Sequence, residues 1–365
     1  MDWLTVTLFV VGLVLLVLGA DFLVKGACRV AAAAGVSSLV IGLTVVAFGT
    51  SAPEMAVSVQ AAWSGQADMA IANVVGSNIF NVLFILGASA MIVPLVVAQQ
   101  MVRRDVPIMI AVSIAMWLFG RDGLLTRVDG AMLFALLIAY TVWIIQVSRR
   151  ESKAVEAEYE GEYGGEAIKR HPLWQSIGWV AAGLVLLVLG SNWLVTGAVE
   201  FAKWMGVDDV VVGLTIVAAG TSLPEVATSL TAAIKGERDI AVGNVVGSNI
   251  FNIMGVLGMS GMVSPAGLTV LDSMAGFDVP VMIAVAFACL PFFAPGFMIP
   301  RWQGLLFLLY YGAYTTYLVL DAKRHQAKAG YASAMLQFVI PLTILTLAVV
   351  GYRVMRNARR NGKAS

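Results

Sequence analysis

The 365-residue chain is poor in cysteine, histidine and charge. It contains two cysteines and two histidines, and only 12% of its residues are charged. Cys28 and Cys289 lie in or beside apolar runs, and His171 and His325 fall in expected loops, so a disulfide framework and a thiolate, zinc or copper site are excluded. Because the net charge is +1 and no basic face or aromatic platform occurs, no nucleic-acid partner is expected.

Apolar residues are abundant instead. They make up 59% of the chain, compared with roughly 45–50% in a soluble domain. The sequence therefore predicts an integral membrane protein whose surroundings are the lipid bilayer. The first apolar run has an acidic rather than a basic start, which argues against a cleaved signal peptide.

We expect eleven membrane-spanning helices, at residues 3–27, 38–62, 69–93, 106–120, 129–147, 173–199, 209–233, 240–264, 279–295, 302–320 and 333–352. The run at 106–120 is shorter than the roughly 17–25 residues that span a bilayer. The positive-inside rule decides in its favour. Eleven spans place 17 of the 23 lysines and arginines on one side, whereas omitting the fourth span of each half gives 13 against 10. This topology predicts a cell-membrane protein with its N-terminus outside and its C-terminus in the cytoplasm.

The chain is organised around an internal repeat. The segment GLTVVAFGTSAPE (42–54) recurs as GLTIVAAGTSLPE (213–225), and 26 of 40 positions are identical between 42–81 and 213–252. Because each copy has five spans, the second enters the membrane from the opposite face. The sequence thus predicts an all-α polytopic membrane protein with two inverted five-helix repeats, a ten-helix core, and one extra C-terminal transmembrane helix. We divide it into repeats at 1–148 and 173–321, a cytoplasmic linker at 149–172, and the extra helix with a basic cytoplasmic tail at 322–365.

Two glutamates lie inside the apolar runs at equivalent positions, Glu54 and Glu225. An ionised carboxylate at this depth costs about 3 kcal/mol or more unless something compensates it. No lysine or arginine is near either glutamate in sequence, so a bound cation is the expected compensation. Two carboxylates facing each other match one divalent ion in charge, and a purely structural role is the less favoured alternative.

Oxygen donors, which hard cations prefer, accompany these acids. Pro53 interrupts its helix and is expected to free carbonyls from Ala47 to Thr50, as is Pro224 from Ala218 onward, and Gly76 is expected to interrupt the third span more weakly. The other donors are the hydroxyls of Thr50, Ser51, Thr221 and Ser222 and, on one face of the third and eighth spans, Asn73, Ser77, Asn81, Asn244, Ser248 and Asn252. Serines bonded to the preceding turn, and asparagines that only satisfy broken-helix backbone, stay open as alternatives.

The two GTSxPE motifs, followed by ANVVGSNIFN and GNVVGSNIFN, resemble the alpha repeats of the calcium/cation antiporter superfamily, in its prokaryotic-type sodium/calcium exchanger branch. The resemblance covers about 320 residues, all but the last span and the tail. It implies a secondary antiporter, not an enzyme, that exchanges sodium for calcium by alternating access. No cofactor is implied, because Ca²⁺ and Na⁺ are the transported substrates, and no protein partner can be inferred.

Carried over by position, the resemblance makes Glu54 and Glu225 the central calcium ligands, shared with sodium sites, and gives Thr50 and Thr221 a role through their backbone carbonyls. It places flanking sodium sites at Ser51, Ser77, Ser222 and Ser248, and the last ligand positions at Asn81 and Asn252. Some relatives, including potassium-dependent exchangers, have an aspartate where this chain has Asn252, so potassium dependence is not expected. Proton-coupled relatives often carry another glutamate beside the GN of this motif, where this chain has valines. Sodium coupling is favoured, and exchange of protons for calcium, or transport of another divalent cation, is the alternative.

Functions of other classes fit less well. A calcium channel would share an oxygen-lined site, but helices broken midway form an occluded site rather than a continuous pore. An intramembrane metal hydrolase needs histidines at ligand spacing, and HExxH is absent from the sequence.

The first and sixth spans carry glycines seven residues apart, at Gly12, Gly19 and Gly26 and at Gly183, Gly190 and Gly197. Such stripes permit close backbone approach. We hypothesise that these two helices slide against a static core, the alternative being ordinary tight packing. Asp21 is expected to pair with Lys25 near the membrane interface, and Asp105 and Asp278 are expected to cap helices.

Overall fold

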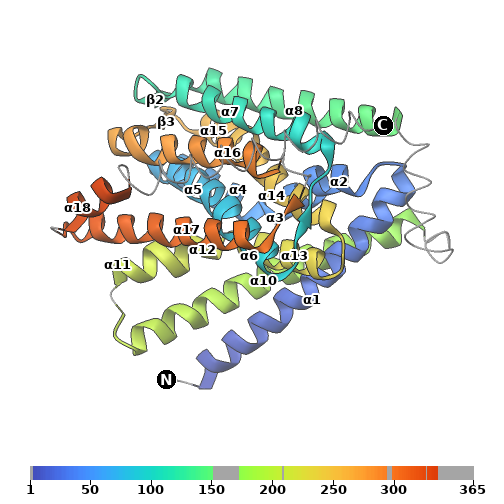
Figure 1. The fold of residues 1–365 in the computed structure, drawn as a ribbon, viewed down its shortest axis with the longest axis horizontal. Helices are drawn as coiled ribbons and strands as arrows, with labels where there is room; N and C mark the ends of the chain where they lie inside the picture. The colour runs from blue at the N-terminus through green and yellow to red at the C-terminus, as the bar shows by residue number, and fades with distance from the viewer. Residues whose placement is uncertain (1–2, 151–171, 208, 294–297, 326, 336–365) are drawn as a thin grey trace, which may run out of the picture.

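The computed structural model describes residues 3–150, 172–207, 209–293, 298–325 and 327–335, and most of them are helical (Figure 1). In the first half, α1 (Trp3–Ala34) is followed by a segmented second helix of α2 (Ser38–Ile41), η1 (Gly42–Val46), α3 (Ala47–Thr50) and α4 (Ala52–Trp63). The third helix consists of α5 (Ala67–Phe80), η2 (Asn81–Leu86) and α6 (Gly87–Ile92). The fourth consists of η3 (Met101–Asp105) and α7 (Val106–Phe119), and the fifth is α8 (Arg127–Arg150).

The second half repeats this order. It begins with α10 (Leu173–Trp204), followed by α11 (Asp209–Val212), η4 (Gly213–Val217), α12 (Ala218–Gly220) and α13 (Leu223–Ile234). Next come α14 (Arg238–Phe251), η5 (Asn252–Leu257) and α15 (Gly258–Val263), then η6 (Met274–Asp278) with α16 (Val279–Phe293), and α17 (Arg301–Ala322). A helix thus occupies each of the ten predicted core positions. After α18 (Ala327–Ala334), most of the predicted eleventh span lies outside the described residues, as does most of the predicted linker.

Each half contains three wide π-helical turns, and the two sets lie at equivalent positions. η1 and η4, like η2 and η5, are 171 residues apart, while η3 and η6 are 173 apart. A π turn shifts the backbone hydrogen bonds by one residue, and such turns are frequent at functional sites. Their pairwise recurrence indicates that the irregular backbone belongs to the repeat.

The second helix is interrupted where the sequence predicts it. The segments Ser38–Thr50 and Ala52–Trp63 meet at a bend of 48°. Pro53 lies in the first turn of α4, where its missing N–H costs no helical bond of that segment. The predicted interruption at Gly76 is wrong, because α5 continues through it to Phe80 and the irregular turn begins at Asn81. A glycine retains its N–H, so it does not break the helix as a proline does.

The antiparallel packing of α1 and α10 shows how the halves are related. Cβ atoms added at Gly12, Gly19 and Gly26 would lie 2.5–2.8 Å from backbone nitrogens of α10, and the contacted residues run backwards, from Leu194 through Leu187 to Val180. Two repeat-equivalent helices that lie antiparallel mean that the halves are inverted. Figure 1 shows this pair running obliquely along one side of the molecule. The tight packing of the glycine stripes is therefore confirmed, and sliding stays a hypothesis.

Two short strand pairs join the halves. β1 (Leu95–Val96) pairs antiparallel with β4 (Met298–Ile299), and β2 (Leu124–Leu125) pairs antiparallel with β3 (Leu268–Thr269). Each pair takes one strand from each half. The connections at the two ends of the bundle therefore follow the same pseudo-twofold relation as the helices.

The predicted capping roles of Asp105 and Asp278 are wrong. Asp105 accepts a hydrogen bond from the hydroxyl of Tyr140 at 3.2 Å, and Asp278 accepts one from Tyr314 at 2.8 Å. Both acids end a π turn that continues into the next helix, so no free helix start is available for them to cap. They instead link the fourth helix of each half to the fifth.

Asp21 forms the predicted ion pair with Lys25, at 2.8 Å, and a second one with Lys235 beyond the end of α13. α1 also packs along α13, whereas the equivalent pair, α10 and α4, barely touches. The halves are therefore packed unequally around the core, although their sequences are similar.

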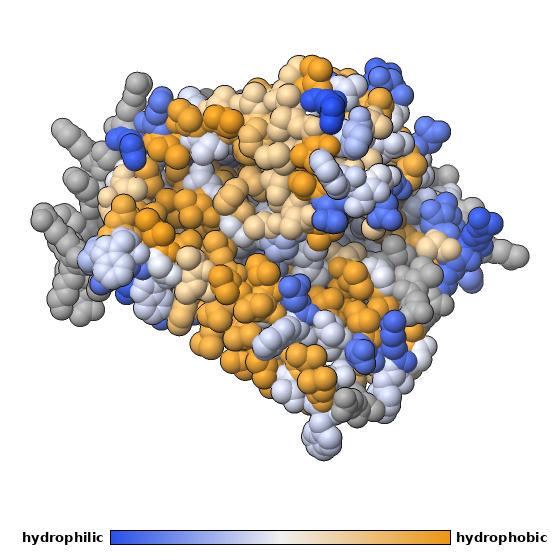
Figure 2. Space-filling model, turned by 180° about the vertical axis from the view of Figure 1, so that it is seen from behind, coloured by the Kyte–Doolittle hydropathy of each residue, from blue (hydrophilic) through white to orange (hydrophobic). Residues whose placement is uncertain are grey.

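The exterior of the described part suits a bilayer. Figure 2 shows a broad band of hydrophobic residues across one face. Large apolar side chains such as Phe9, Val17 and Leu309 are exposed, while every residue of α14 from Ile240 to Phe251 is buried. Among the described residues, six helices are long and apolar enough to cross a membrane, and the bent second helix makes a seventh. The protein is a multi-pass membrane protein with α14 near its centre.

Candidate ion-binding site

The first turns of α4 and α13 meet inside the protein and carry Glu54 and Glu225, whose side chains are fully buried. Ser51 Oγ donates a hydrogen bond to Glu225 Oε1 at 2.8 Å, and Ser222 Oγ donates one to Glu54 Oε1 at 2.7 Å. Each serine precedes the glutamate of its own repeat by three residues. The crossed bonds therefore hold the two carboxylates close together across the pseudo-twofold axis.

Each carboxylate uses only one oxygen in this way. Glu54 Oε2 and Glu225 Oε2 are buried without a hydrogen-bond partner, and among the described residues neither carboxylate forms an ion pair. The N-termini of α4 and α13 contribute partial positive charge, but only about half an elementary charge each. Two buried carboxyl groups with a free oxygen apiece form a candidate site for a cation.

Neutral oxygens without partners lie in neighbouring segments, among them η2, which packs against α13, and η5, which packs against α4. Asn81 Oδ1, Asn252 Oδ1, Thr221 Oγ1 and Ser248 Oγ are buried and make no hydrogen bond. Thr221 lies beside Glu54, and Ser248 lies beside Glu225. An unsatisfied buried polar atom costs roughly 1–3 kcal/mol, so several in one place indicate a ligand. Within the described ranges no three acids, histidines or cysteines cluster, which leaves two carboxylates with neutral oxygens, a set suited to calcium or sodium.

A ring of four asparagines orients two of these oxygens. Asn81 Nδ2 donates to Asn249 Oδ1 at 3.0 Å, and Asn252 Nδ2 donates to Asn78 Oδ1 at 3.1 Å. The other two amides donate to backbone, Asn78 to the carbonyl of Asn249 and Asn249 to that of Asn78. Because the amide nitrogens of Asn81 and Asn252 are taken, their oxygens are left free. The sequence prediction missed Asn78 and Asn249, although both are identical in the two copies.

Asn73 and Asn244 hold the glutamate helices in place. Asn73 Nδ2 donates to Ser58 Oγ at 2.9 Å and to the carbonyl of Glu54 at 3.4 Å. Asn244 makes the same two bonds to Ser229 and Glu225, at 2.9 and 3.4 Å. The amide nitrogens of these asparagines therefore bond to the backbone of the broken helices, as the alternative expected.

The expected freeing of the Ala47 carbonyl is wrong. This carbonyl accepts a hydrogen bond from the backbone N–H of Ser51 at 3.0 Å. The missing N–H of Pro53 removes the partner of the residue four positions earlier, which is Gly49. In the second half, Ala218 is exposed, and the carbonyl of Gly220 accepts from Ser191 Oγ at 2.6 Å.

The serines of the site do not follow the alternative considered from the sequence, in which each serine hydroxyl bonds to the preceding helical turn. Ser51 and Ser222 bind the opposite carboxylates instead. Ser77 Oγ lies 3.2 Å from Ser222 Oγ, which places it at the same centre. The structure therefore brings together the carboxylates and the serines of both repeats.

Access to this centre is one-sided. The segment α2–η1–α3 covers α14, so that a Cβ added at Gly247 would lie 2.7 Å from Leu43. The equivalent segment α11–η4–α12 packs less closely on α5 and contacts it mainly through α12, and Cβ atoms added at Gly76 and Gly213 would meet nothing within 4 Å. Accordingly Ile240 on α14 is 0% exposed, while its equivalent on α5, Met69, is 53% exposed.

A side-chain bond marks the closed side. Thr50 Oγ1 donates to Asn244 Oδ1 at 3.0 Å, between α3 and α14. The equivalent hydroxyl, Thr221 Oγ1, has no hydrogen-bond partner. The site is therefore covered more tightly at the end of the molecule at which α14 begins than at the end at which α5 and α11 begin.

Comparison with known proteins agrees with this geometry. The family model described as "Sodium/calcium exchanger protein" matches residues 4–146 and 175–320. The chain is 43% identical over 289 residues to a protein named as an antiporter, CaxA of Alkalimonas amylolytica, covering 79% of this chain and 89% of that one. It is 34% identical to the sodium/calcium exchanger MaX1 of Methanosarcina acetivorans, covering 85% and 97%.

A solved structure of the sodium-calcium exchanger NCX_Mj, soaked with Na⁺ and Ca²⁺, superimposes with a TM-score of 0.72 at 32% identity, covering 88% of this chain and 99% of that one. The family consists of membrane antiporters, not enzymes, and calcium is among the cations that its members exchange. The chain belongs to the sodium/calcium exchanger protein family.

Proposed function

We propose that this protein moves calcium across the membrane in exchange for sodium, by alternating access to one central site that contains Glu54 and Glu225. The observation that carries the proposal is the pair of crossed serine bonds, which leaves each buried carboxylate with one free oxygen. Such a pair is stable in lipid only while cations neutralise it. One calcium ion, or sodium ions in its place, supplies that charge.

The ligand shell follows from the free oxygens. The two carboxylates and Ser51, Ser77, Ser222 and Ser248 surround the centre, and the backbone carbonyls of Thr50 and Thr221 complete it. The amide oxygens of Asn81 and Asn252 are the remaining ligands, held in place by Asn249 and Asn78. Asn73, Asn244, Ala47 and Ala218 act around the shell rather than in it, since their polar groups hold backbone or face away.

Alternation follows from the inverted repeat. The segment that seals α14 has an equivalent that leaves α5 uncovered, so exchanging the two arrangements would open the site to the other side. The closely packed pair of α1 and α10 is the element that moves. Its contacts with the core differ between the halves, since α1 packs along α13 whereas α10 barely touches α4. Each half then forms one gate of the same site.

Sodium is the proposed counter-ion because the site has two acids and no third. Asn252 stands where potassium-dependent relatives have an aspartate, and its amide oxygen is free to bind a cation. Valines stand where proton-coupled relatives often have a further glutamate. Exchange of protons for calcium is the alternative, since protons could also neutralise Glu54 and Glu225.

Radiocalcium uptake into proteoliposomes tests the proposal. We expect an outward sodium gradient to drive uptake and a pH gradient of equal size to drive little. Glu54→Gln and Glu225→Gln remove one charge each without changing size, so each variant should lose sodium-driven uptake. Asp278→Asn is the matched control, because this acid lies outside the site, and it should retain uptake. Uptake driven by the pH gradient alone would instead establish the proton alternative.

The proposed orientation places the N-terminus outside and both the linker (149–172) and the tail in the cytoplasm of the cell, with the repeats at 1–148 and 173–321. The distribution of lysine and arginine supports it. In this orientation the open side of the site faces outward, because α5 and α11 both begin at the outer end.

A further inference from the structure

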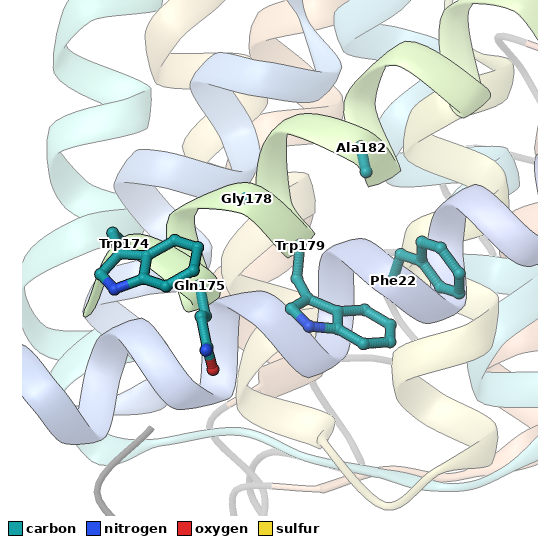
Figure 3. A pocket seen from close by; sticks show the side chains of 6 residues that line it. All are labelled: Phe22, Trp174, Gln175, Gly178, Trp179 and Ala182. Atoms are coloured by element: carbon teal, nitrogen blue, oxygen red, sulfur yellow. The ribbon is translucent and has the colours of Figure 1, made fainter. Parts of the chain in front are cut away.

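A groove lies between α1 and α10, and none of its lining residues belongs to the ion site. Its lining residues are Phe22, Trp174, Gln175, Gly178, Trp179 and Ala182, and its volume is about 340 Å³ (Figure 3). This volume falls within the roughly 300–1,000 Å³ of ligand pockets. Gly178 forms the floor, since a Cβ added there would meet nothing within 4 Å.

The walls are aromatic, and a cation lies at one wall. The rings of Phe22 and Trp179 meet edge to face, with centroids 4.6 Å apart, and Trp174 on the other flank is 71% exposed. Arg29 Cζ lies 5.4 Å from the centre of the Trp179 ring. Among the described residues Arg29 forms no ion pair, whereas Lys25, one turn earlier, is paired with Asp21. An apolar trough beside a guanidinium that forms no ion pair with any described residue is complementary to a molecule with an anionic head and an apolar chain.

The groove lies where a phospholipid headgroup would be. α10 has 32 residues and is about 48 Å long, which exceeds the roughly 30 Å of a bilayer core. Its first turn therefore reaches the headgroup region, where tryptophans such as Trp174 are enriched. In the proposed orientation this is the cytoplasmic leaflet, in which anionic lipids create a negative surface.

The internal repeat indicates that the groove is not a requirement of the fold. The equivalents at the opposite end of the helix pair are Thr7 for Gly178, Leu8 for Trp179 and Glu200 for Arg29. That end has a side chain where the groove has its floor, and an acid where the groove has its cation. The ion-site residues are the same in both halves, so this difference is specific to one membrane face.

We propose that the groove binds one anionic phospholipid, with its phosphate at Arg29 and an acyl chain over Gly178 between Trp174 and Trp179. The lipid contacts both α1 and α10 and so bridges the helix pair from its membrane side. Binding does not require the ion site to be occupied, so this inference rests on the proposed orientation but not on the proposed transport.

Native mass spectrometry of the purified full-length protein tests the inference, with equal amounts of a phosphatidylglycerol and a phosphatidylcholine of identical acyl chains. We expect wild type to retain one phosphatidylglycerol in preference to phosphatidylcholine. Arg29→Gln should reduce that preference about fivefold, which corresponds to about 1 kcal/mol. Gly178→Leu should fill the floor and lose both lipids.

Two matched controls separate the groove from general effects. Arg121→Gln removes an arginine that also lies over a tryptophan ring, 5.5 Å from Trp117, and Thr7→Leu enlarges the equivalent of Gly178. Both should retain the wild-type preference. Equal retention of the two lipids by wild type, an unchanged preference in Arg29→Gln, or a second protein copy in place of the lipid would each overturn the inference.

Discussion

At the scale of single residues, the site depends on bonds between the two repeats rather than within them. Ser51 binds the glutamate of the second half and Ser222 that of the first, so neither half forms its carboxylate environment alone. Hydrogen bonds to charged groups contribute roughly 1.5–3 kcal/mol. A neutral hydroxyl thus fixes one carboxylate oxygen and leaves the other for the transported ion.

The variants Ser51→Ala and Ser222→Ala should therefore weaken calcium binding. Loss of one fixed oxygen allows the carboxylate to rotate away, and we expect the apparent calcium affinity to fall about tenfold or more in each variant. The calcium dependence of sodium-driven uptake measures it. Ser113→Ala is the control, because this buried serine donates to the carbonyl of its own preceding turn, and it should behave as wild type. Equal affinities in all three variants would refute the role of the crossed bonds.

Part of the site could be predicted from the sequence because the acids and serines are polar residues in apolar runs and recur in both copies. Asn78 and Asn249 recur as well, but they lie off the helical face shared by Asn73, Ser77 and Asn81. Their role depends on the contact between α5 and α14, which no single-helix pattern describes. The prediction that the Ala47 carbonyl is free was wrong because a proline removes the hydrogen bond to the carbonyl four positions earlier, which for Pro53 is that of Gly49.

At the scale of elements, the helices follow from hydrophobic length, and the bend at Pro53 follows from proline chemistry. The π turns cannot be predicted in this way, because segments such as Asn81–Leu86 contain no proline or glycine that would mark an irregular turn. The glycine stripes of α1 and α10 are explained by backbone contact in both directions. Such interlocking makes the two helices a single rigid unit.

Substitution within the interlock should therefore affect the whole unit. A Cβ at Gly183 would lie 2.6 Å from the backbone nitrogen of Leu23, which cannot move aside as a flexible side chain can. We expect Gly183→Ala to cost about 1–3 kcal/mol and to lower the temperature of thermal unfolding in detergent. Gly312→Ala on α17, where a Cβ meets nothing within 4 Å, should leave it unchanged or raise it slightly. Equal effects of the two substitutions would contradict the interlock.

At the scale of the whole molecule, the two halves share sequence but not packing. α14 is covered by α2–η1–α3, and the Thr50 hydroxyl binds Asn244, whereas α5 is covered less closely and the Thr221 hydroxyl makes no hydrogen bond. No sequence pattern predicts this difference, because the residues concerned are nearly the same in both copies. The asymmetry is a property of the conformation, and it is the form expected of one end state of an alternating transporter.

Cysteine substitutions at the equivalent positions Met69 and Ile240 test that interpretation. Met69 is 53% exposed on the uncovered helix, and Ile240 is 0% exposed on the covered one. In the conformation described, a membrane-impermeant thiol reagent should modify the Met69→Cys variant quickly and the Ile240→Cys variant slowly, at rates read by mass spectrometry with the reagent on both sides. Ion conditions that favour the opposite state should reverse the order, because covering α5 requires uncovering α14. If both sites reacted alike whichever ions were present, the two gates would not alternate. The native cysteines should not add to the measured labelling. Cys289 is buried, and both variants are made in a protein in which Cys28 is replaced by serine.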